Sequence, residues 1–340
     1  MTGESGNRRA TIPTTFHGRA RRLGAAAALL LRALALVVGL AATLPGTDVA
    51  AFEVGFTRLT LAKTSVTTGL PRPLDPIVWY PTTARKGATA LGIEDAPMLR
   101  GRRPLLVFSH GACGRPTEAT YLTKALASRG FVVAAPAHPG DTADDGLAVC
   151  GTLATTIDSA VNRVPDVQAT LDAVLAAFAA HLRADRIGIT GLSFGGFTTL
   201  LAAQEEPRIR AALAMVPGGT AALLQGPAHD LSIPAMVIGA EHDQVVGYPE
   251  SVSAFARLAG PRFLVKLLAA NHLSVVDDCF NHDLDVSLCV PTDISQDDAH
   301  GLVLHYAVPF FRRYLANARR AGRTLVRPVA GVELTAEPTW

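Results

Sequence analysis

The sequence has little that points to nucleic acid or metal as a partner. Six of the 31 Lys and Arg and two of the 29 Asp and Glu lie in residues 1–51, so the rest of the chain carries a net charge of −2. No basic stripe follows residue 51, which argues against nucleic-acid binding. Only four cysteines occur and none forms a CxxC pair, so we expect no structural zinc site. Nothing in the sequence implies a metal or an organic cofactor.

The sequence also lacks internal repeats and low-complexity linkers. Its 340 residues are 49% hydrophobic and 18% charged, a composition typical of a globular protein with one large core. We therefore expect residues 52–325 to form a single domain and the protein to be a monomer. Residues 326–340 are expected to form an irregular C-terminal extension.

The first 51 residues have the pattern of an export signal. Three arginines between residues 19 and 22 form a positive segment, and residues 23–44 are apolar except for Arg32. Small or β-branched residues stand at the positions that a signal peptidase reads, so we expect cleavage after Ala51. The protein is then secreted or periplasmic.

An uncleaved membrane anchor is the alternative, since the apolar run is long enough to span a bilayer. Arg32 at the centre of such a span would cost roughly 2.5–3.5 kcal/mol, which favours cleavage. We expect any membrane association to be transient and confined to this N-terminal segment.

Short apolar runs alternate with helical patterns from residue 52 onward. Strands are expected at 55–61, 76–80, 105–108, 131–135, 186–190, 211–216, 235–239 and 263–268, and helices at 117–129, 165–182, 194–204, 249–258 and 300–319. This alternation predicts an α/β fold with a mostly parallel, doubly wound sheet. Only a turn-rich segment separates the first two strands, which predicts an antiparallel pair at the N-terminal edge of the sheet.

The strongest local signal is the segment Gly191-Leu192-Ser193-Phe194-Gly195, a G-x-S-x-G motif between a predicted strand and a predicted helix. The glycines are needed because the neighbouring chains approach a sharp turn closely. The turn raises the serine hydroxyl above the sheet edge. We therefore predict Ser193 to be a catalytic nucleophile.

A serine nucleophile needs a base, and the base needs an acid to orient it. In this motif's usual fold the acid and the histidine follow the serine in that order. Asp243 follows the strand 235–239, and His272 follows the strand 263–268. Both emerge at the edge of the sheet where Ser193 lies. We assign Asp243 as the acid and His272 as the base.

Other residues could fill the same two roles. Glu241 also follows the strand 235–239 and is the alternative acid. His282, His300 and His305 are alternative bases, although only His272 directly follows a predicted core strand.

The negative charge of the transition state requires fixed donors. We expect one donor to be the backbone N–H of Phe194, directly after the nucleophile, and the other to come from the loop after the strand 105–108. Ala112 N–H is the candidate in that loop, because Gly111 permits the turn that exposes it. We interpret His110, in the same loop, as structural.

Several segments together resemble a known family. They are Val78–Pro81, Phe108–Gly111, Ala137–Gly140, Pro165–Val167, Gly191–Gly196 and the loops at Asp243 and His272. Over residues 54–315 the chain resembles the α/β-hydrolase superfamily, and within it the dienelactone-hydrolase-like and platelet-activating-factor-acetylhydrolase-like esterases. Bacterial cutinase-like polyester hydrolases are near neighbours. Dienelactone hydrolases use a cysteine nucleophile, so Ser193 makes a serine esterase the better implication of this resemblance.

An even number of cysteines in an exported protein favours disulfides over buried thiols. Four cysteines allow three pairings, and the sequence alone does not choose among them. Placement favours Cys279–Cys289, which lie close together on one loop, and Cys113–Cys150. The second bridge would clamp the loop that holds Ala112.

The predicted function is hydrolysis of carboxylic esters by an exported enzyme, on a small-molecule or lipid-like substrate. No insertion long enough for a large lid occurs between residues 216 and 235, and acidic residues at 141, 144 and 145 predict a polar rim. We therefore expect short acyl groups to be preferred. A peptidase or amidase of the same fold and a non-catalytic cell-surface binding protein are the alternatives.

Overall fold

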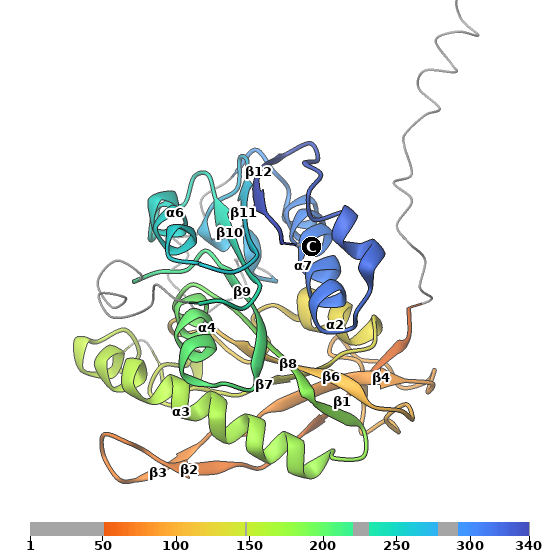
Figure 1. Ribbon diagram of the computed structural model, residues 1–340. Coiled ribbons are helices and arrows are strands. Elements are labelled where there is room, and N and C mark those ends of the chain that lie inside the picture. The colour runs from red at the N-terminus through yellow and green to blue at the C-terminus, as the bar shows by residue number, and fades with distance from the viewer. Residues whose placement is uncertain (1–50, 147, 220–230, 278–291, 340) are drawn as a thin grey trace, which may run out of the picture. The chain divides into compact units, whose positions relative to one another are not determined.

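The computed structural model describes residues 51–146, 148–219, 231–277 and 292–339, and Figure 1 traces the chain. In these residues the strands form a ten-stranded sheet, in the order β12-β11-β10-β9-β8-β6-β7-β4-β1-β5, and a separate hairpin, β2–β3. The strands are β1 (Glu53–Arg58), β2 (Ala62–Thr64), β3 (Pro71–Pro73), β4 (Ile77–Thr82), β5 (Ile93–Glu94), β6 (Arg103–Ser109), β7 (Val132–Ala135), β8 (Leu182–Leu192), β9 (Ile209–Met215), β10 (Ala235–Ala240), β11 (Arg262–Leu267) and β12 (Val332–Glu337).

The centre of the sheet is parallel. Six strands lie side by side in the order β11, β10, β9, β8, β6 and β7, and each adjacent pair among them is parallel. Strand β4 is antiparallel to β7, and β1 is antiparallel to β4. The predicted α/β class with an antiparallel N-terminal edge is confirmed, and the short strand β5 adds a parallel partner beyond β1.

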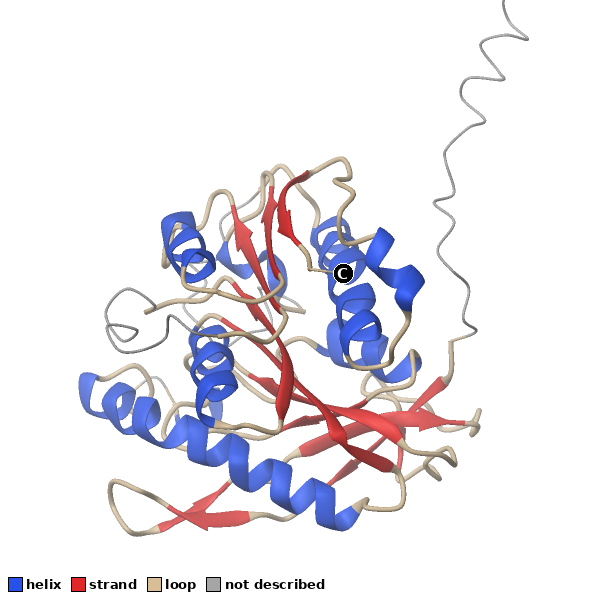
Figure 2. Ribbon diagram, in the orientation of Figure 1, coloured by secondary structure: helices blue, strands red, loops and turns tan. Residues whose placement is uncertain are grey.

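Helices cover both faces of the sheet, as Figure 2 shows. They are α2 (Thr120–Ser128), α3 (Leu153–Ala177), α4 (Phe194–Glu205), α6 (Tyr248–Ala256) and α7 (Gln296–Tyr314), with 3₁₀ turns η1 (Ala143–Asp145), η3 (His272–Val275) and η5 (Arg319–Arg323). None of the helices in the described ranges is long and apolar enough to cross a membrane.

Each face of the sheet buries its own apolar cluster, because successive residues of a strand point to opposite faces. In β6, Leu106 and Phe108 pack with side chains of α2 and α7. Leu105 and Val107 of the same strand pack with side chains of α3, α4 and α6. Burial on both faces explains why the central strands read as continuous apolar runs.

The expectation of an irregular extension after residue 325 is wrong for Val332–Glu337. These residues form β12, which pairs antiparallel with β11 along its whole length. Burial alternates along β12, with Val332 buried and the next residue exposed. An edge strand with one exposed face carries few apolar residues, so the apolar-run criterion did not detect it.

Helix α3 begins twelve residues before the predicted start at Pro165. The Thr152 side chain accepts a hydrogen bond from Thr155 N–H and caps the helix. Inward-facing residues of this first half include Ser159 and Arg163, which are buried and polar. The regularly spaced apolar residues of this half, Leu153, Ile157 and Val161, are exposed instead, so the pattern is not the usual one of an apolar face turned to the core.

Candidate active site

Ser193 lies in the sharp turn between β8 and α4. Its φ of 53° and ψ of −120° place it in the positive-φ region, which costs about 1–3 kcal/mol for a residue other than glycine. A Cβ atom on Gly195 would overlap the backbone carbonyl of Ser109, and one on Gly191 would crowd the same carbonyl. The two glycines therefore let β6 approach the turn closely, and the sharp turn predicted from the sequence is confirmed.

Asp243 and His272 are in hydrogen-bond contact. His272 Nδ1 lies 2.8 Å from Asp243 Oδ2. The other carboxylate oxygen, Oδ1, accepts hydrogen bonds from the N–H groups of Val245 and Val246 at 3.0 and 2.9 Å. Burial raises the pKa of Asp243, but the hydrogen bonds from His272 and the two amides outweigh it, so the pKa lies below its ordinary value. An ionised Asp243 holds the proton of His272 on Nδ1 and leaves Nε2 free to accept another.

The three predicted residues emerge at one edge of the sheet. Ser193 follows β8, Asp243 follows β10 and His272 follows β11. These strands run in parallel through β9, so their carboxyl ends share an edge. The structure thus joins Asp243 to His272 directly and places Ser193 at the same edge.

The alternative acid and bases occupy other positions. Glu241 pairs with Lys266 at 3.0 Å and accepts a backbone hydrogen bond. His300 Nε2 lies 2.7 Å from the carbonyl oxygen of Val276, and burial lowers its pKa. His282 lies outside the described residues.

The predicted oxyanion loop follows β6. Gly111 N–H donates to Glu118 Oε2 at 2.7 Å, and Cys113 N–H donates to Asp141 Oδ1 at 3.0 Å. Ala112 lies between these two amides and is exposed. The loop is therefore held on both sides of Ala112 by buried carboxyl groups, while Ala112 faces solvent.

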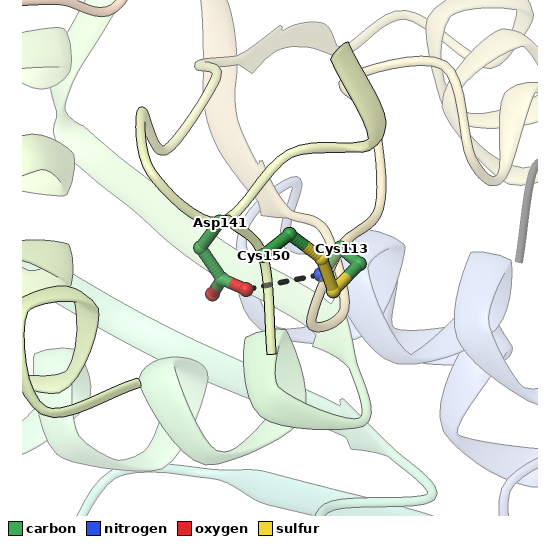
Figure 3. Close-up of side chains that lie close together, drawn as sticks. All are labelled: Cys113, Asp141 and Cys150. Atoms are coloured by element: carbon green, nitrogen blue, oxygen red, sulfur yellow. Dashed lines mark hydrogen bonds between the residues drawn. A yellow bond between two sulfur atoms is a disulfide. The ribbon is translucent and has the colours of Figure 1, made fainter. Parts of the chain in front are cut away.

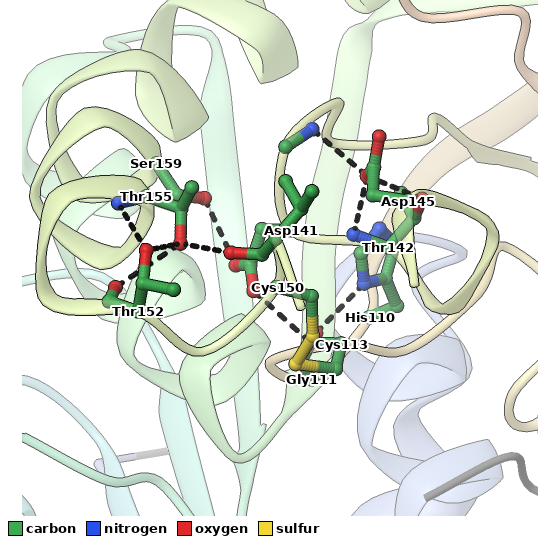
Figure 4. Close-up of a disulfide and its surroundings, with 12 residues drawn as sticks. His110, Gly111, Cys113, Asp141, Thr142, Asp145, Cys150, Thr152, Thr155 and Ser159 are labelled. Carbon is green, nitrogen blue, oxygen red and sulfur yellow. Dashed lines mark hydrogen bonds between the residues drawn. A yellow bond between two sulfur atoms is a disulfide. The ribbon is translucent and has the colours of Figure 1, made fainter. Parts of the chain in front are cut away.

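A disulfide joins Cys113 to Cys150, the pairing that the sequence favours, with a Cα–Cα distance of 5.5 Å. Figure 3 shows Asp141 beside it, and Figure 4 shows the bridge between the loop after β6 and the segment before α3. Cys113, Asp141 and Cys150 lie within 4.8 Å of one another, but bridged sulfurs cannot act as thiolate ligands. Cys279 and Cys289 lie outside the described residues.

The expected acidic rim is largely missing. Asp141 is buried, and its carboxylate binds Arg163 and Cys113 N–H. The Asp145 carboxylate accepts hydrogen bonds within its own loop. Of the three acids, only Asp144 presents an exposed carboxylate. Asp141 and Asp145 thus stabilise the loops around them rather than line a mouth, because their carboxyl groups accept hydrogen bonds from backbone N–H groups.

A buried network next to the loop after β6 was not predicted from the sequence. Ser109 Oγ lies 3.0 Å from His138 Nε2, and His138 Nδ1 lies 2.9 Å from Asp166 Oδ2. This is the connectivity of a Ser-His-Asp triad, yet all three side chains are fully buried. Burial, followed by the charge of Arg163, holds the pKa of His138 well below its ordinary value. The network is structural, since no substrate can reach it.

Comparisons with known proteins agree with the fold. A family model described as "PETase: PET hydrolase-like" matches residues 102–273. Cutinase est2 and cutinase est1 of Thermobifida alba are 30% and 29% identical to the chain over 144 residues, 41% of this chain and 42% of each relative. The chain thus matches less than half the length of these curated relatives. A solved ferulic acid esterase from Streptomyces cinnamoneus has a TM-score of 0.70 at 22% identity, covering 86% of this chain and 98% of that one; this likeness concerns the fold alone.

Proposed function

The chain belongs to the PET hydrolase-like family of the α/β-hydrolase superfamily, and from this premise we propose that it hydrolyses carboxylic esters with Ser193 as nucleophile. His272 is the general base, and Asp243 orients it. The observation that carries the proposal is the 2.8 Å contact between His272 Nδ1 and Asp243 Oδ2 at the sheet edge where Ser193 emerges.

In this mechanism Ser193 Oγ attacks the ester carbonyl carbon while His272 Nε2 takes its proton. The carbonyl oxygen becomes negatively charged and is stabilised by the backbone N–H groups of Ala112 and Phe194. Collapse of this intermediate releases the alcohol, which receives the proton from His272. Water then attacks the acyl-enzyme by the same route and regenerates Ser193.

The test is hydrolysis of p-nitrophenyl acetate by the purified mature protein. Ser193→Ala and His272→Ala are each expected to lower kcat by about 10³-fold or more, because a triad acts as a unit. Ser232→Ala and His242→Ala are the matched controls, since both residues are exposed. Retention of near-normal activity in Ser193→Ala would contradict the proposal.

We further propose that the substrates carry short acyl groups. The 19 residues between β9 and β10 (216–234) are too few for a large lid domain that could cover a long acyl group. A long acyl chain requires a continuous apolar groove, worth about 0.8 kcal/mol per buried methylene. The value of kcat/KM should therefore fall from acetate and butyrate esters to palmitate, and a maximum at laurate or longer esters would overturn this preference.

We also propose that the protein is exported and cleaved after Ala51. Strand β1 begins at Glu53, so this cleavage leaves the sheet intact. The Cys113–Cys150 disulfide also favours an oxidising compartment. N-terminal sequencing of the secreted protein should begin at Phe52; a mature chain that retains residues 23–44 would indicate an anchor instead.

A further inference from the structure

We propose that Arg163 is a positioning residue for the oxyanion hole, because its guanidinium fixes the peptide group that carries the Ala112 N–H. The inference rests on the proposed function, in which that N–H stabilises the negative charge of the transition state. Arg163 does not touch the substrate in this account; it acts through the backbone of the oxyanion loop.

The Arg163 guanidinium is buried in the first half of α3 and faces the loop after β6. Its Nη1 donates to the carbonyl oxygen of His110 at 2.6 Å, and its Nη2 donates to the carbonyl oxygen of Gly111 at 3.0 Å. On its other side, Nη2 and Nε donate to Asp141 Oδ2 at 2.7 and 3.2 Å. Nε also donates to Ser159 Oγ at 3.1 Å. The rigid guanidinium therefore connects a fixed carboxylate to two consecutive loop carbonyls.

The second of these carbonyls determines where the oxyanion donor points. The carbonyl of Gly111 and the N–H of Ala112 belong to one planar trans peptide group and point in opposite directions. A group that holds the carbonyl oxygen therefore also sets the direction of the N–H. His110 Nδ1 lies 2.7 Å from the same oxygen and reinforces its position. A cationic donor on the carbonyl also polarises the peptide group, which strengthens its N–H as a donor.

Hydrogen bonds of the two neighbouring N–H groups also fix the position of the Ala112 peptide group. Gly111 N–H is engaged by Glu118, and Cys113 N–H is engaged by Asp141. Asp141 thus binds both Arg163 and the amide that follows Ala112. The peptide groups before and after that of Ala112 are held by buried carboxyl groups, which restricts its rotation.

The same guanidinium contacts the residue that supplies the other donor. Arg163 Cζ lies 4.5 Å from the centroid of the Phe194 ring, within the range of a cation–π interaction. Arg163 Nη1 also donates to Ser109 Oγ at 3.2 Å, at the end of β6. One buried cation therefore contacts both sides of the predicted oxyanion hole.

A second buried arginine provides a matched control. Arg72 pairs with Asp166 at 3.0 Å and donates to the carbonyl oxygen of Pro139 at 2.6 Å. Its side chain is buried like that of Arg163, but it binds Asp158, Asp166 and Pro139 rather than the oxyanion loop. A loss of stability common to both arginines can thus be separated from an effect specific to the hole.

The test compares Arg163→Lys and Arg163→Gln with Arg72→Lys in p-nitrophenyl acetate hydrolysis, with folding checked by circular dichroism. We expect kcat to fall about 10-fold in Arg163→Lys and about 100-fold in Arg163→Gln, with KM changed less than about 3-fold. Arg72→Lys should keep kcat within about 2-fold of the wild type. Affinity for an alkyl boronic acid, whose tetrahedral adduct with Ser193 occupies the oxyanion hole, should fall in parallel with kcat.

Folded Arg163 variants with wild-type kcat and boronate affinity would overturn the inference, as would a rise in KM alone. If neither variant folds, Asp141→Asn keeps the guanidinium but weakens its anchor, and we expect kcat to fall about 10-fold. An unchanged kcat in that variant would also overturn the inference. Failure of the proposed function is distinguishable, because the wild type itself would then hydrolyse no ester.

Discussion

Replacement of Glu118 by Gln should remove a pH dependence of stability that the buried carboxyl group creates. Burial raises the pKa of Glu118 from 4.5 to about 7, while the hydrogen bond from Gly111 N–H and the charge of Arg163 act in the opposite direction. The introduced amide would keep the shape of the side chain and an oxygen acceptor for the Gly111 N–H. The variant therefore changes the titration and little else.

The direction in which stability changes with pH follows from the number of protons that the folded and unfolded chains bind. Below about pH 4.5 the carboxyl is protonated in both the folded and the unfolded chain. As the pH rises toward about 7, the unfolded chain loses this proton while the folded chain retains it, so the free energy of unfolding falls. The shift to about 7 corresponds to on the order of 3 kcal/mol. Above the pKa of Glu118 in the folded chain, the free energy of unfolding falls no further on account of this group.

The assay is urea unfolding of the wild type and Glu118→Gln at a series of pH values from about 4.5 to about 8. The free energy of unfolding of the variant relative to the wild type should rise by on the order of 3 kcal/mol across this range. Glu53→Gln, at an exposed position, is the control and should show no such trend. Parallel curves for Glu118→Gln and the wild type would refute the assignment of a raised pKa.

The remaining predictions concern the bridge, the acid and the turn. In the double variant Cys113→Ser with Cys150→Ser, the free energy of unfolding measured with urea under non-reducing conditions should fall by about 4 kcal/mol, because the bridge closes a loop between cysteines 37 residues apart. A fall of less than about 1 kcal/mol would contradict the chain-entropy explanation. Asp243→Asn should lower kcat about 10³–10⁴-fold with little change in KM, because an amide donor would favour the wrong His272 tautomer. Gly195→Ala should abolish ester hydrolysis and lower the thermal unfolding midpoint, because its methyl group overlaps the backbone of β6; an active variant would show that the turn can relax.

Much of the fold was predictable because its central strands are buried on both faces. Runs such as Leu105–Phe108 and Ala235–Gly239 are apolar throughout, and the structure places both in the parallel part of the sheet. The motif around Ser193 could be found because its glycines are required by local sterics. Residues that follow successive parallel strands share a sheet edge, which made Asp243 and His272 candidates without any knowledge of their distance.

The buried charges could not be predicted in the same way. Arg163, Asp141 and Glu118 come from different elements, and their contacts depend on packing that no spacing in the sequence reveals. In the first half of α3 the regularly spaced apolar residues Leu153, Ile157 and Val161 are exposed, whereas the Arg163 side chain faces inward, so apolar spacing does not mark the buried face there. A sequence motif identifies the groups that react, whereas the groups that position them appear only in the folded chain.

Covalent labelling tests the central claim most directly. The mature protein is treated with a fluorophosphonate, digested with a protease and mapped by mass spectrometry, in parallel with Ser193→Ala. We predict one adduct, on Ser193, with loss of p-nitrophenyl acetate hydrolysis in proportion to labelling, and no adduct in the variant. Labelling at another residue, or full hydrolysis by a protein with Ser193 blocked, would contradict the account.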